Sequence, residues 1–144
     1  MHMKRLKSKA GLIVRGQRGN PVVRKALVRF ARWARANQDF PVRVPVYLNA
    51  KEKHLTLENE WVCASFFAPY SRRGQPYIRI ATGDYPKLLR ARGRNDALAA
   101  IIMSFCHELV HYRQWVETGT ITERGVLVRA RAMLQQYADF ARTP

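Results

Sequence analysis

The sequence contains few of the residues that form disulfides or bind metal ions, namely cysteine, histidine and the acidic residues. It contains only two cysteines, Cys63 and Cys106, which have neither CxxC spacing nor a dense, even framework. Disulfide stapling and a thiolate-rich metal site are therefore disfavoured, and we expect both cysteines to be free and buried. Histidine occurs only four times and acidic residues only ten times. Any metal site in this chain must be built from very few candidate ligands.

Long apolar runs are also missing. No run approaches the roughly 20 residues of a membrane-spanning helix, and the apolar stretch AGLIV near the N-terminus is shorter than the core of a secretion signal. Hydrophobic residues make up 47% and charged residues 25% of the chain, the balance of a globular domain. We expect a cytoplasmic protein with no membrane partner; the sequence does not indicate its oligomeric state.

Negative charge is scarce, and positive charge is unevenly distributed. The chain has 26 Lys and Arg against 10 Asp and Glu, a net charge of +16. Residues 1–50 hold 12 of the basic residues and one acid. The pattern predicts an electropositive N-terminal surface, and nonspecific nucleic acid is a candidate partner for it.

The N-terminal region divides into two parts. Residues 1–19 are basic and punctuated by glycine, which favours an arm that is mobile or ordered only against a partner. Asn20 and Pro21 form a helix start, and residues 20–144 are expected to form a single domain. The helix from Pro21 has an apolar arc and a cationic arc, and the latter comprises Arg24, Lys25, Arg29, Arg32 and Arg35.

The rest of the chain predicts a small sheet followed by helices. Short runs rich in β-branched and aromatic residues predict strands at about 42–49, 61–68 and 76–82, with a fourth around 55–57. A long helix is predicted over about 97–116, stopped by Gly119, and a last helix begins at Thr120 or Thr122. The class is α+β, with a sheet of three or four strands covered by helices.

The stretch FCHELVHYRQWVETGTITERG carries the chemistry. His107 and His111 are four residues apart, so on a helix they lie about 6 Å apart along the axis and about 40° apart around it. They can share one ion, and Glu108 beside them can act on a metal-bound water. The alternative is a helix whose histidines are satisfied by neighbours and whose Glu108 is merely solvated.

A catalytic zinc ion needs three protein ligands and one open position. After His111 the chain offers three acids, Glu117, Glu123 and Asp139. Glu117 has the spacing of the metzincin third ligand, but Gln114 replaces the glycine at which that pattern turns. Asp139 lies far along the last helix. We expect Glu123 to be the third ligand, because a chain that reverses near Gly119 returns it towards the histidines.

Glu123 also has an alternative role. The spacing Thr120-x-x-Glu123 is a capping-box pattern, which would occupy the carboxylate at the start of the last helix. If Thr122 is the cap instead, Glu123 is free to bind the metal.

HELVH followed by ERGVLVRARAML resembles the gluzincin zinc metallopeptidases, in which a glutamate on the next helix completes HExxH. The minigluzincins and the ImmA/IrrE-type peptidases are the most similar, although Gly125 and Val126 depart from the Glu and Ala usual in the ImmA/IrrE segment ExEAxxFAxxLL. SprT-type peptidases use a third histidine after HExxH, which this chain lacks. The resemblance covers about 40 residues, Ala97 to Tyr137.

The resemblance implies a zincin-like half-domain that hydrolyses peptide bonds with one Zn²⁺. His107, His111 and Glu123 would hold the metal, and Glu108 would be the general base. An edge strand, with PYIRIATG as the candidate, would pair with a peptide or protein substrate. Tyr112, Tyr137 or an arginine would stabilise the oxyanion, and His54 is expected at the surface.

The alternative function is a latent or non-catalytic zinc-binding protein that associates with nucleic acid through its basic N-terminal face. Cys63, Cys106 or the N-terminal arm would then cover the open position of the zinc. Cys106 is a poor candidate, because it points about 100° away from His107 on the helix.

Overall fold

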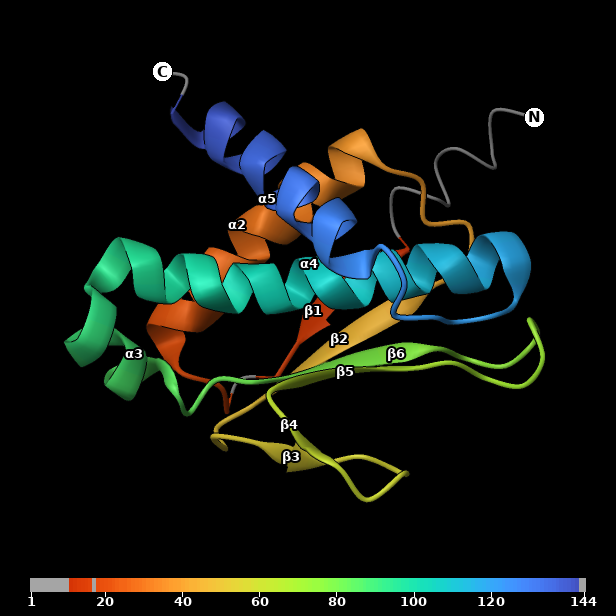
Figure 1. Cartoon of the computed structure of the whole chain (residues 1–144), viewed down its shortest axis with the longest axis horizontal. Helices are drawn as coiled ribbons and strands as arrows, with labels where there is room; N and C mark the ends of the chain where they lie inside the picture. The colour runs from red at the N-terminus through yellow and green to blue at the C-terminus, as the bar shows by residue number, and fades with distance from the viewer. Residues whose placement is uncertain (1–10, 17, 143–144) are drawn as a thin grey trace.

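A computed structural model describes residues 11–16 and 18–142. Its main sheet has the strand order β1-β2-β6-β5 (Figure 1). β1 pairs parallel with β2 and β2 parallel with β6, whereas β5 pairs antiparallel with β6. The strands are β1 (Leu12–Arg15), β2 (Val44–Asn49), β5 (Ala64–Phe67) and β6 (Tyr77–Ala81).

Four helices accompany the sheet within the described residues, which confirms the α+β class. They are α2 (Pro21–Asn37), α3 (Tyr85–Arg92), α4 (Arg94–Thr118) and α5 (Val126–Arg142). α4 lies across the sheet, and α5 packs on α4 from the side away from the strands (Figure 1). None of these helices is both long and apolar enough to cross a membrane.

One face of the sheet is buried against the helices. Val46 and Phe66 flank Ile78 in register, and all three belong to the core or pack against it. The ring of Phe66 contacts the rings of Tyr112 and Trp115 on α4. Because side chains alternate along a strand, this packing fixes which face of the sheet α4 covers.

α2 begins where the sequence predicts. The Asn20 side chain accepts hydrogen bonds from the backbone N–H groups of Val22 and Val23, and Pro21 occupies the first helical position.

The predicted cationic arc of α2 is only partly exposed. Arg35 is half-buried and donates to the Leu12 carbonyl, joining α2 to β1. The residues of the arc that are exposed are Lys25, Arg29 and Arg32.

Part of the expected N-terminal arm is an ordered edge strand. Residues 1–10 and 17 lie outside the described part of the chain, but Leu12–Arg15 form β1, and Leu12 is fully buried. At Gly11 a Cβ atom would lie 2.3 Å from the Phe40 carbonyl oxygen, so only glycine fits at this close approach. The structure thus corrects the expectation of an arm over residues 1–19, because Leu12–Arg15 form a strand although basic residues flank them.

The predicted edge strand is in the interior of the sheet. PYIRIATG contains β6, which lies between β2 and β5, so the expectation was wrong. The predicted strand over 61–68 divides at Cys63 into β4 (Trp61–Val62) and β5, because β4 pairs with β3 (His54–Leu55) instead of joining the main sheet. The edge beside β6 is therefore β5.

The sequence-based expectation that His54 lies at the surface was wrong: its side chain is buried, at 2% exposure. Its Nε2 lies 2.9 Å from the Ser65 hydroxyl, which ties the β3–β4 hairpin to β5. Burial, together with the positive charges of Arg79 and Lys51, lowers the pKa of His54 from 6.5 to about 4. His54 is thus neutral in the folded protein at neutral pH.

This burial predicts a pH-dependent stability. As pH falls below about 6.5, the unfolded chain protonates His54 while the folded chain does not, so stability is lost progressively down to about pH 4. The loss is at most about 1.4 kcal/mol per pH unit for one proton. Urea unfolding of wild type and His54→Gln at pH 7.5, 6 and 5 should show a shallower pH dependence in the variant. Equal slopes in the two proteins would contradict the assignment.

Candidate metal centre

α4 carries the HExxH residues on a longer helix than predicted. It runs from Arg94 to Thr118, and Gly119 ends it in the left-handed conformation, with φ of +76°. The Gly119 N–H bonds to the Trp115 carbonyl at 2.9 Å. The predicted stop at Gly119 is confirmed, and the left-handed turn sends the chain back along α4.

Residues 120–125, here called the return segment, bring Glu123 to the histidines. α5 begins only at Val126, directly after Gly125 with its φ of +75°, and not at Thr120 or Thr122. Glu123 therefore lies in a loop before the helix. The Thr122 hydroxyl accepts from the Arg124 N–H in a local turn, while the Glu123 carboxylate contacts the two histidines.

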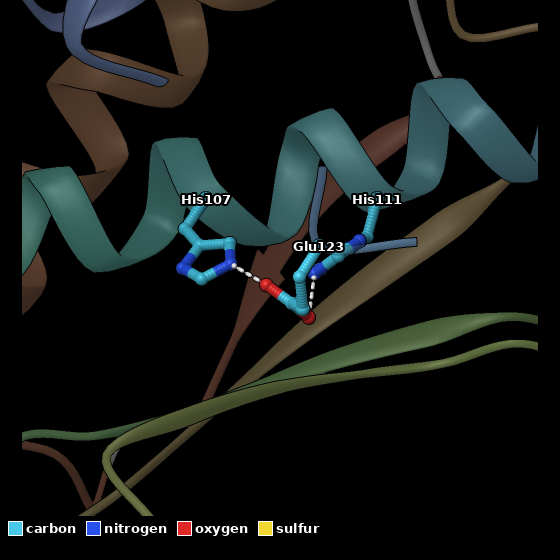
Figure 2. A group of neighbouring side chains, drawn as sticks. All are labelled: His107, His111 and Glu123. Atoms are coloured by element: carbon cyan, nitrogen blue, oxygen red, sulfur yellow. Dashed lines mark hydrogen bonds and ion pairs between the residues drawn. The ribbon is translucent and has the colours of Figure 1, made fainter. Parts of the chain in front are cut away.

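Three side chains converge beneath α4. Both imidazoles project from the same side of the helix, and the carboxylate of Glu123 lies between them (Figure 2). His107 Nε2 is 3.0 Å from Glu123 Oε1, and His111 Nε2 is 2.9 Å from Oε2. One ligand atom from each residue lies within 4.8 Å of the others, so the group can hold a metal ion.

Burial within the group is graded. The side chain of His111 is 6% exposed, that of His107 35% and that of Glu123 75%. One side of the group is therefore enclosed by protein and the other faces solvent. A metal held here would have room for water or a substrate on the Glu123 side.

The surroundings of the His111 ring favour a positive charge, either on the ring itself or on a metal ion bound to it. Its Nδ1 lies 3.0 Å from Gln114 Oε1, so both ring nitrogens face an acceptor oxygen. A neutral imidazole has a single N–H and cannot donate to both. A second ring proton would satisfy the arrangement, and so would a metal cation between Nε2 and the carboxylate. Two imidazoles and one carboxylate are a ligand set that zinc accepts.

The two glutamates near the histidines have opposite pKa shifts. Burial by itself would raise the pKa of Glu123, but the hydrogen bonds and charges of His107 and His111 outweigh it and lower that pKa. Burial, together with the negative charge of Glu123, raises the pKa of Glu108 to about 8. Glu108 is 7% exposed, and its environment favours a carboxyl that holds its proton near neutral pH.

The other acids considered as ligands lie elsewhere. Glu117 is exposed on α4 and lines a pocket with Arg113 and Arg129, outside the His107, His111 and Glu123 group. Asp139 is exposed on α5, accepts a hydrogen bond from Gln135 and is also outside the group.

The two tyrosines considered for the oxyanion are engaged elsewhere. The Tyr112 hydroxyl donates to the Val42 carbonyl, and the side chain is fully buried. The ring of Tyr137 packs against those of Phe30 and Trp33 on α2. The structure thus brings neither of them to the candidate centre.

The cysteines are both free. Cys106 is fully buried, and burial raises its pKa to about 12. Metals bind the thiolate form, so a thiol with this pKa is a poor metal ligand. Cys63 is half-buried, which corrects the expectation that both are buried.

Sequence reasoning missed Gln114 as part of the centre. In the sequence, Gln114 was considered only because it replaces the glycine of the metzincin pattern. In the structure its side chain is buried and hydrogen-bonds to both His111 and Thr122. Its position three residues after His111, on the same helix face, is the signal that would have found it.

The chain was compared with protein-family models, curated proteins and solved structures, and none of them matches it.

The convergence predicts that Glu123 contributes to metal binding. Replacing Glu123 with Ala removes one of the three candidate ligands, so if the group binds Zn²⁺ the affinity should fall by more than the roughly 10–100-fold typical of a residue that only supports a ligand. Glu117→Ala, on an exposed glutamate outside the group, is the matched control and should leave the affinity unchanged. Competition with a chromophoric chelator measures both. A loss in the control that equals the loss in Glu123→Ala would contradict the assignment.

Proposed function

We propose that this protein is a zinc-dependent metallopeptidase of the gluzincin type, with a zincin-like fold. The observation that carries the proposal is the approach of Glu123 to the Nε2 atoms of both His107 and His111, with Glu108 buried beside them. Those three side chains would hold one Zn²⁺. Bound there, the ion supplies Lewis-acid polarisation of a carbonyl and a water of lowered pKa.

Glu108 is the proposed general base. It follows His107 on the same helix, and the charge of Glu123 is close enough to raise its pKa. A carboxyl whose pKa lies near the working pH can accept a proton from water and return it to the leaving nitrogen of the peptide. The raised pKa of Glu108 belongs to the metal-free centre, where it favours the protonated acid; the positive charge of a Zn²⁺ bound to the neighbouring histidines would lower that pKa and free the carboxylate to act as a base.

β5 is the proposed docking edge for an extended peptide. It is the antiparallel edge strand, and in the described residues it pairs only with β6. β5 contacts α4 directly and lies on the side of α4 from which the two histidines project (Figures 1 and 2). An extended substrate that added a strand beside β5 would therefore run close to the proposed zinc.

The test is the substitution Glu108→Gln. Removing the proton acceptor should lower the rate of peptide hydrolysis by roughly 10²–10⁴-fold, while the bound zinc, measured by elemental analysis, stays near one ion per chain. Hydrolysis is followed with a quenched fluorescent peptide library. Cleavage that survives the substitution, or wild-type protein that binds no zinc, would contradict the proposal.

A second candidate function is association with nucleic acid, either by this peptidase or by a latent zinc protein. Lys25, Arg29 and Arg32 are exposed on one face of α2, and a pocket of about 380 Å³ is lined by Lys25, Arg29 and Arg94. No acidic residue lies in α2 itself. Such a surface favours phosphate binding through release of counterions, without sequence specificity.

This candidate predicts salt-dependent binding to a random DNA duplex. Changing Lys25, Arg29 and Arg32 to Gln should weaken binding and flatten the plot of log affinity against log salt by up to about 0.9 for each lost phosphate contact. The matched control changes Lys53, Arg72 and Arg73, three exposed cations elsewhere on the molecule, to Gln. Equal losses in the two triple variants would reduce the effect to net charge, and no binding at low salt would remove the function.

A further inference from the structure

Gln114 contacts two parts of the candidate centre at once. On one side its Oε1 lies 3.0 Å from His111 Nδ1. On the other its Nε2 donates to the Thr122 carbonyl at 2.9 Å, and its Oε1 accepts from the Thr122 N–H at 3.3 Å. Thr122 directly precedes Glu123, so one buried amide links a histidine of α4 to the segment that carries the carboxylate.

The backbone of Thr122 determines how this amide is oriented. If the amide were rotated by 180°, its NH₂ group would face the Thr122 N–H and its oxygen would face the Thr122 carbonyl. Two donors and two acceptors would then oppose each other in a buried site, which is costly. The orientation that places Oε1 towards His111 is therefore the one that the main chain selects.

That orientation in turn selects the tautomer of His111. Because Oε1 can only accept, Nδ1 of the imidazole must carry the proton. In the neutral imidazole the lone pair is then on Nε2, the atom that faces Glu123, and a cation between Nε2 and the carboxylate would satisfy both. A metal-binding histidine generally needs such a partner on its other nitrogen, which sets both the tautomer and the ring orientation.

We infer that Gln114 is a positioning residue that presets His111 for metal binding and holds the return segment so that Glu123 reaches the same ion. The inference rests on the proposed zinc function and deepens it. Gln114 would not touch the metal or the substrate. Its effect would pass through the imidazole on one side and through the main chain next to Glu123 on the other.

Thr118 offers a matched control on the same helix. Its single hydroxyl proton is shared between the main-chain carbonyls of Gln114, at 2.8 Å, and Thr120, at 3.0 Å, and its oxygen accepts from the Thr120 N–H at 3.1 Å. Thr118 therefore holds the return segment in the way that Gln114 does, but none of its hydrogen bonds involves a histidine. A Thr118→Val substitution loosens the segment and leaves the partner of His111 in place.

The experiment measures Zn²⁺ affinity and the tautomer of His111 in wild type, Gln114→Met and Thr118→Val. Affinity comes from competition with a chromophoric chelator, and the tautomer from ¹⁵N chemical shifts of the imidazole in the metal-free protein. Gln114→Met should weaken zinc binding by roughly 10–100-fold and increase the population with the proton on Nε2. Thr118→Val should change affinity less than about threefold and leave the tautomer unaltered.

Other outcomes would overturn the inference. Equal losses of affinity in both variants, with an unchanged tautomer, would make Gln114 a support of the loop alone. Wild-type affinity in Gln114→Met would remove its role altogether. If Gln114→Met does not fold, Gln114→Glu, which keeps an acceptor facing Nδ1, must retain the wild-type tautomer. Zinc binding by wild type without peptide cleavage would defeat the proposed function and leave this inference standing, whereas absence of zinc binding by wild type would defeat both.

Discussion

Every feature of the candidate centre depends on the burial of α4 between the sheet and α5. Apolar residues such as Phe105 and Leu109 fix the rotation of the helix about its axis. That rotation directs His107 and His111 towards the same point, because residues four apart share a face. The strands contribute indirectly, since Phe66 of β5 packs on Tyr112 and Trp115 and sets the height of the helix above the sheet. The hydrophobic core is thus what aligns the polar groups.

Parts of this arrangement were predictable because their signals are local. The apolar periodicity of α4, the HExxH spacing and the left-handed glycine at 119 all act within one helix and its end. The pairing of Leu12 with Val44 was not predictable, because contacts between residues so distant in sequence leave no local pattern. For the same reason the sequence did not reveal that β6 lies inside the sheet. The pairing of β1 with β2 and the interior position of β6 are set by contacts between distant parts of the chain.

Glu123, the candidate third ligand, illustrates the difference between what local sequence patterns and what tertiary contacts determine. Scarcity of acids after His111 left three candidates, and simple chain geometry favoured Glu123. Whether its carboxylate would cap a helix depended on where α5 starts, and that start depends on Gly125 and on contacts of the return segment with Gln114. The capping pattern Thr120-x-x-Glu123 is present in the sequence, but α5 starts only at Val126 and the Glu123 carboxylate contacts the two histidines.

The two halves of the centre differ in how firmly they are held. His107 and His111 belong to a regular helix, whereas Glu123 follows a left-handed glycine, precedes another and is largely open to solvent. Closing so short a loop costs little conformational entropy, and that cost rises only by about 0.6 kcal/mol for each doubling of length. An ion bound by all three would act as a crosslink between α4 and the start of α5. Metal binding and the order of the last helix would then be thermodynamically linked, each strengthening the other.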